Sequence, residues 1–89
     1  MFSVWVRTIK EEKLQKNAVI DFDEKFNKAK FFDYVSKVCN ELDIPTPVIL
    51  DKHINHFMSF NNTHFTKDDF VESVDFDRLV LEYCKDDQK

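Results

Sequence analysis

Glycine is absent from this chain of 89 residues, although average usage of ~7% would place about six glycines in a chain of that length. A phosphate-binding Walker loop and a dinucleotide-binding turn both need glycine, because only a backbone without Cβ comes close enough to the phosphates. The nucleophile elbow of α/β-hydrolases also needs glycine. The sequence therefore excludes these motifs.

Cysteine is scarce as well, with only Cys39 and Cys84 present. Two cysteines are too few for a disulfide framework, and they lack the C-x-x-C spacing of redox and zinc-ribbon motifs. Cys39 falls in a helical apolar pattern, and Cys84 ends a strand-like pattern. Both are therefore predicted to be buried free thiols, as is typical of a protein in the reducing cytoplasm.

Positive charge is also in deficit, because the formal net charge is −4 at pH 7. This balance argues against a binder that holds nucleic acid mainly through Lys and Arg. No apolar run approaches the ~18 residues of a membrane helix, and residues 1–7 lack the pattern of a signal peptide. We expect a cytoplasmic protein without membrane contact.

Phenylalanine, in contrast, is abundant, with ten residues in a chain that is 43% hydrophobic. A small domain needs such bulky side chains to build a sufficient core. The sequence predicts one domain over residues 1–85 and a solvated tail over residues 86–89.

Strand patterns occur at both ends of the chain. Residues 2–9 alternate, with Phe2, Val4 and Val6 on one parity and Trp5 and Ile9 on the other. Because both parities carry apolar residues, this strand is either covered on both faces or has an interface on its outer face. Residues 13–22 resume the strand pattern after a turn at residues 11–12, and residues 76–84 form a last strand.

Helix patterns fill the middle of the chain. Residues 31–42 carry apolar side chains at helical spacing, which predicts an amphipathic helix of about four turns. Pro45 and Pro47 end it, and Asp51 is the predicted N-cap of a second helix over residues 52–60. Residues 61–63 are predicted to be a loop, and Thr66 to begin a short helical turn.

These elements predict an α+β domain of two layers. The expected order is strand, strand, helix, helix, short helical turn, strand. The three strands are expected to form one antiparallel sheet, with the helices on one face.

Three histidines offer a candidate metal site. His53 and His56 are three residues apart on the second predicted helix, where two imidazoles could meet one zinc or other divalent ion, and His64 follows. The motif lacks the spacing and the glutamate of zincins. The alternative is a pair of surface histidines without a ligand.

Three aromatic residues fit the core-facing stripes least well: Trp5, Phe60 and Phe65. They are candidates for an exposed patch that binds a protein partner or a second copy of the chain. The alternative is an ordinary place in the core.

Basic residues near the predicted hairpin suggest a third surface. Arg7, Lys10, Lys13 and Lys16 could contact nucleic acid. The overall acidic balance makes nucleic acid an unfavoured partner.

Two stretches, residues 41–50 and 70–79, resemble a family of small proteins from low-GC Gram-positive bacteria. Members share the length of this chain, the early Trp and hairpin, an extended segment with Pro after the main helix, and a Phe-Asp entry into the last strand. The family has no assigned activity, cofactor or partner. The resemblance implies a stand-alone bacterial protein of the cytosol and no mechanism.

The sequence thus favours a non-enzymatic module that acts through protein contacts, including self-association. A metal- or small-ligand-binding protein that uses the face of His53 and His56 is the alternative. A nucleic-acid accessory module is the third hypothesis.

Overall fold

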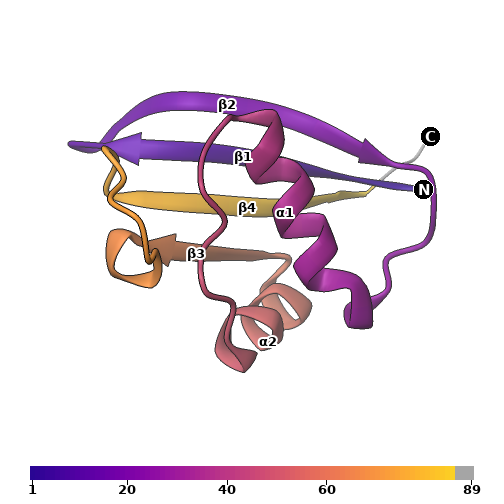
Figure 1. Cartoon of the computed structure of the whole chain (residues 1–89). Coiled ribbons are helices and arrows are strands. Elements are labelled where there is room, and N and C mark those ends of the chain that lie inside the picture. The colour runs from indigo at the N-terminus through magenta and orange to yellow at the C-terminus, as the bar shows by residue number, and fades with distance from the viewer. Residues whose placement is uncertain (86–89) are drawn as a thin grey trace.

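A computed structural model describes residues 1–85 of the protein as one α+β domain (Figure 1). Its elements follow one another in the order β1 (Phe2–Lys10), β2 (Lys13–Phe22), η1 (Lys28–Lys30), α1 (Phe31–Glu41), α2 (Asp51–Phe60), β3 (Asn62–Thr66), η2 (Lys67–Asp69) and β4 (Arg78–Lys85). Among residues 1–85, no helix is both long and apolar enough to cross a membrane.

The sheet has four antiparallel strands in the order β2-β1-β4-β3, so the predicted three-stranded sheet and element order were wrong. The missing element is β3, whose first residues were predicted to be a loop. Its inward positions are Thr63 and Phe65, which alternate as in a half-buried strand. Five residues beginning with a polar run give too little alternation to distinguish a strand from a loop. β4 also begins two residues later than predicted.

Both helices lie on the same side of the sheet, as predicted (Figure 1). The core therefore forms between the helices and the inward parity of the strands. Phe2, Val4 and Val6 of β1 face it together with Val35 and Val38 of α1, all fully or almost fully buried. The central pairing of β1 with β4 brings the two ends of the chain together in the middle of the sheet.

The predicted four-turn helix is shorter in the structure. α1 has 11 residues and is preceded by the 3-10 turn η1, in which the amide of the second residue, Ala29, donates to the side chain of Asn27. The second helix was predicted well, although Leu50 rather than Asp51 occupies its N-cap position. At Thr66, the amide donates to the carboxylate of Asp69, as the predicted capping pattern requires.

The absence of glycine leaves a conformational cost at the β1–β2 turn. Glu11 and Glu12 both have positive φ, 51° and 65°, as the two central residues of a type I′ hairpin turn must. A left-handed conformation costs a residue with Cβ about 1–2 kcal/mol. Glu11 is fixed there in part because its amide donates to the carboxylate of Asp77 at 2.8 Å.

Replacing Glu12 with glycine is therefore expected to raise the free energy of unfolding by about 1 kcal/mol. Urea denaturation measures this change as a higher midpoint with an unchanged slope. Glu41→Gly in α1 is the matched control and is expected to cost about 1 kcal/mol, because glycine is unfavourable in a helix. A lower midpoint for Glu12→Gly would contradict the left-handed turn.

Candidate functional site

The first candidate surface is the outer face of the sheet, which no helix within residues 1–85 covers (Figure 1). Trp5 and Ile9 of β1 lie there, since their parity is opposite to the buried Val4 and Val6. The neighbouring strands add Val19, whose side chain is 60% exposed, and the half-buried Val80. The apolar residues Trp5 and Ile9, which alternate with the core-facing residues of β1, thus lie on the face of the sheet that the helices leave uncovered.

Charged groups hold Trp5 in place on this face. The guanidinium carbon of Arg7 lies 4.0 Å from the centroid of the Trp5 ring. The same guanidinium forms an ion pair of 3.4 Å with Glu82 of β4. Trp5 is therefore half-buried under its neighbour rather than fully open, as a cation–π contact requires.

The other two aromatic candidates, Phe60 and Phe65, differ in solvent exposure. Phe60 ends α2 and is 64% exposed, so it lies on the surface as expected. The prediction for Phe65 was wrong, because its side chain is fully buried. Since β3 is a strand and not a loop, Phe65 points inward, and its ring lies 4.3 Å from that of His53.

The cysteines also differ from each other. Cys39 is fully buried, and burial raises the pKa of its thiol to about 12, so it stays protonated and unreactive. Cys84 lies on the outer face of the sheet and is only half-buried, so the prediction that both thiols are buried was wrong for Cys84. Neither forms a disulfide.

The basic residues of the hairpin do not share one face. Arg7 lies on the outer face, whereas Lys16 lies on the helix side and donates to the carbonyl of Leu42 at 3.2 Å. Lys10 and Lys13 are paired at the turn. The structure thus divides these four cations between three places.

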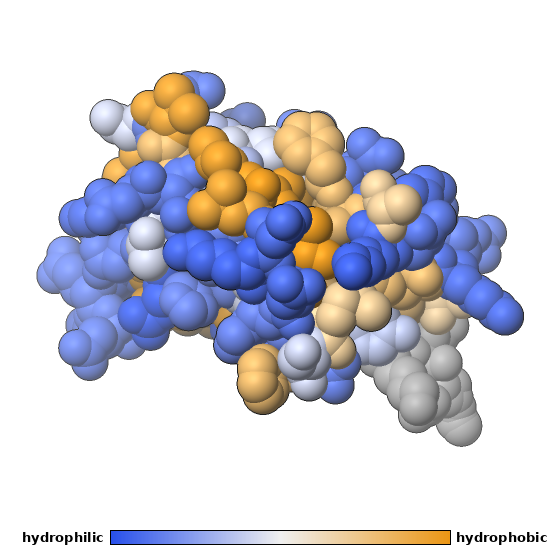
Figure 2. Space-filling view, turned by 90° about the horizontal axis from the view of Figure 1, so that it is seen from below, coloured by the Kyte–Doolittle hydropathy of each residue, from blue (hydrophilic) through white to orange (hydrophobic). Residues whose placement is uncertain are grey.

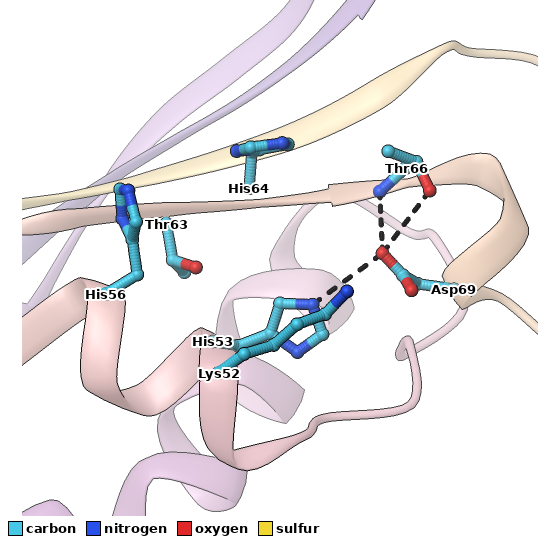
Figure 3. Close-up of a pocket in the computed structure, with 7 residues that line it drawn as sticks. All are labelled: Lys52, His53, His56, Thr63, His64, Thr66 and Asp69. Atoms are coloured by element: carbon cyan, nitrogen blue, oxygen red, sulfur yellow. Dashed lines mark hydrogen bonds and ion pairs between the residues drawn. The ribbon is translucent and has the colours of Figure 1, made fainter.

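The second candidate surface is a pocket of about 210 Å³ between α2 and β3 (Figure 3). It brings all three histidines of the chain to one place. Its lining residues are Lys52, His53, His56, Thr63, His64, Thr66 and Asp69.

His53 is buried at the back of this pocket, and both of its ring nitrogens are engaged. Its Nδ1 accepts a hydrogen bond from the amide of Leu50 at 2.9 Å, which closes the first turn of α2. Because Nδ1 is an acceptor, the proton of the neutral ring lies on Nε2, which faces the carboxylate of Asp69 at 3.7 Å. Burial lowers the pKa of His53, and the charge of Asp69 opposes this only in part.

This pairing of a carboxylate with an imidazole resembles the orienting half of a catalytic triad. In a triad, however, the second ring nitrogen is free to take a proton from the nucleophile. Here that nitrogen caps α2, so His53 supports the helix and has no free lone pair for a substrate or a metal.

The other two histidines differ from His53 and from each other. The Nδ1 atom of His56 lies 2.7 Å from the carbonyl of Asn62 and donates to it, so Nε2 is free. Figure 3 shows the ring of His64 on the side of β3 that faces away from α2. These orientations depend on the packing of β3 against α2, so the sequence could not predict them.

Within the described residues 1–85, no group of three or more His, Cys, Asp or Glu side chains is arranged to hold a metal ion. The zinc hypothesis stays a prediction, and with the nitrogens of His53 engaged it depends on His56 and His64.

Sequence reasoning missed Lys52, Thr63 and Asp69 as lining residues of the pocket. Asp69 had a local signal, because it lies three residues after Thr66 in the capping pattern. Thr63 had none, since its burial depends on the pairing of β3 with β4.

No protein-family model, no curated protein and no solved structure matches this chain.

Proposed function

We propose that this protein is a non-enzymatic module of the cytoplasm that associates with a second copy of itself through the outer face of its sheet. The observation that carries the proposal is the composition of that face, which has apolar side chains in three of its four rows and is divided in charge along the strands. The two free thiols of the protein, Cys39 and Cys84, support the cytoplasmic location, because the cytoplasm is a reducing compartment.

Four rows of side chains cross the outer face. In order from the end near the chain termini to the hairpin end, they are Asp21–Ser3–Cys84, Val19–Trp5–Glu82–Asn62, Asn17–Arg7–Val80–His64 and Leu14–Ile9–Arg78–Thr66. Apolar side chains occur in every row except the first, whose Cys84 is the least polar member. Opposite residues in a row are close enough to form one continuous patch.

The charges of this face are separated by row. The first two rows contain the acids Asp21 and Glu82, and the last two contain the bases Arg7 and Arg78. When two copies stack face to face with their strands reversed, the acidic half of one copy faces the basic half of the other. When the two copies instead stack with their strands in the same direction, like charges face each other. The charge pattern therefore favours one symmetric, self-complementary arrangement.

The size of the face suits a moderate interface. Four strands ~4.8 Å apart and about 25 Å long give a footprint of roughly 500 Å². The accessible area of a rough surface exceeds its footprint, so the buried area approaches the ~600–800 Å² per partner of small specific interfaces. We expect a dissociation constant in the micromolar range.

The edges of the sheet are less suited to self-association. The free edge is β2, which carries Lys13, Lys16 and Asp21 and so resembles the charged edge strands that resist pairing. The other edge, β3, has only five residues and is in contact with α2. Association through the face is thus the better supported of the two modes.

A second apolar surface is the rival to this proposal. Figure 2 shows the side of the molecule that carries α2, where apolar side chains gather in a band bordered by hydrophilic ones. Exposed apolar residues of this part of the chain are Val48, Leu50, Met58 and Phe60.

The test is sedimentation velocity over micromolar to millimolar protein concentrations. The wild-type protein is expected to shift from monomer to dimer. Val19→Asp is expected to weaken the association at least about tenfold, or ~1.4 kcal/mol, because a carboxylate would be desolvated within the interface. Val19→Ile keeps the apolar surface and is expected to associate like the wild type.

Phe60→Asp is the matched control for the rival band and is expected to leave the dimer intact. A wild-type protein that stays monomeric at millimolar concentration overturns the self-association proposal. A dimer that Phe60→Asp dissociates, and Val19→Asp does not, moves the interface to the α2 side.

A further inference from the structure

The pocket between α2 and β3 contains a buried hydroxyl group that has no hydrogen-bond partner among the described residues 1–85. The side chain of Thr63 is only 2% exposed, and Figure 3 shows it directed from β3 toward α2, between His56 and His53. None of the hydrogen bonds formed by side chains within residues 1–85 includes this hydroxyl, although its neighbours His56 and Thr66 both form one. Buried polar groups in proteins are usually paired, so this hydroxyl points to a partner from outside the chain.

The charges around this hydroxyl are unequally compensated. Asp69 is the one acid that lines the pocket, and its Oδ2 atom accepts from the amide and the hydroxyl of Thr66 and faces His53. Lys52 also lines the pocket, and it forms no ion pair among residues 1–85. Of these two charged groups, Lys52 is therefore the one that has neither a hydrogen bond nor an ion pair among residues 1–85.

His56 adds a third polar group to the pocket. With Nδ1–H donating to Asn62, the Nε2 atom of the neutral ring is free to accept a hydrogen bond. The pocket thus combines a cation, a hydroxyl donor and an imidazole.

We propose that this pocket binds a small oxyanion, with the anionic group held by the Lys52 ammonium and the Thr63 hydroxyl. Carboxylate and phosphate groups share this chemistry, because both present several oxygen acceptors to charged and neutral donors. The volume of about 210 Å³ lies below the ~300–1,000 Å³ of pockets for drug-sized ligands, so the ligand has few heavy atoms. Lys52 and Thr63, the two groups that hold the anion, lie in α2 and on the helix side of β3, outside the proposed dimer interface. This inference is therefore independent of the proposed self-association.

The experiment is a titration of the ¹⁵N-labelled protein at pH 6.5, followed by amide chemical shifts. Sodium acetate and sodium phosphate are added in separate arms, and sodium chloride at equal ionic strength is the third arm. We expect saturable shifts at residues 52, 56 and 63 with acetate, phosphate or both, and no saturable shift with chloride. The arm that saturates at the lower concentration identifies the anion class.

Two variants test the assignment of the donors. Thr63→Val keeps the shape of the side chain and removes the hydroxyl, and Lys52→Met keeps its length and removes the charge. Each is expected to weaken binding about tenfold or more, as befits a lost hydrogen bond to a charged group. Lys28→Met, in η1, is the matched control and is expected to bind like the wild type.

The melting temperature separates binding from folding. Thr63→Val is expected to melt at or above the wild-type temperature without added anion, because it removes an unpaired buried hydroxyl. Equal, linear shifts in all three arms overturn the proposal. So does wild-type affinity in a folded Thr63→Val variant.

Discussion

Replacing Phe65 with alanine is expected to lower the free energy of unfolding by about 3–5 kcal/mol. Phe65 is fully buried between β3 and α2, and its ring contacts that of His53. Truncation leaves a cavity that the surrounding sheet cannot fill by relaxing. Because domains of this kind are stable by only about 5–15 kcal/mol, the variant is expected to unfold at a much lower urea concentration.

Phe60→Ala is the control for this measurement, since it removes the same atoms from a side chain that is 64% exposed. The free energy of unfolding of Phe60→Ala is expected to lie within about 0.5 kcal/mol of the wild-type value, as for most surface substitutions. Phe65→Leu retains most of the buried volume, so its free energy of unfolding is expected to lie between those of the two alanine variants. Equal midpoints for Phe65→Ala and Phe60→Ala would contradict the placement of β3 in the sheet.

Acidification is expected to destabilise the protein through His53. Burial holds the pKa of this imidazole below the ordinary value of 6.5. Below pH 6.5 the unfolded chain therefore takes up a proton at His53 while the folded protein does not, so acid favours unfolding. The contribution of His53 to stability is complete above pH 6.5 and is lost as the pH falls from there toward its pKa in the folded state.

The measurement is urea denaturation between pH 8 and pH 5, compared with a variant that does not titrate. His53→Asn keeps an acceptor for the amide of Leu50 and is expected to show a flatter dependence of stability on pH over this range. His53→Ala, which leaves that amide and Asp69 without their partner, is expected to cost about 1–3 kcal/mol at pH 8. A pH dependence that is identical in the wild type and in His53→Asn would exclude His53 as its source.

The sequence by itself determined the fold class and most of the secondary structure. The alternation of Phe2, Val4 and Val6 and the helical spacing of Val35 and Val38 are local patterns that depend only on which face of an element is buried. The apolar residues Trp5 and Ile9 of β1 also predicted that its second face would be either covered or the site of an interface. These features could be predicted because each is encoded within one segment of the chain.

Only the tertiary structure decided the features that depend on pairing between distant segments. β3 exists as a strand because β4, whose paired residues lie 12 to 20 positions later in the sequence, supplies its hydrogen bonds. This pairing buries Phe65 and Thr63. Likewise, the two ring nitrogens of His53 interact with the amide of Leu50 and the carboxylate of Asp69. The helical pattern of the sequence could not predict these two partners. The physical reason is that burial and hydrogen-bond partners are properties of the assembled layers, whereas periodicity is a property of one segment.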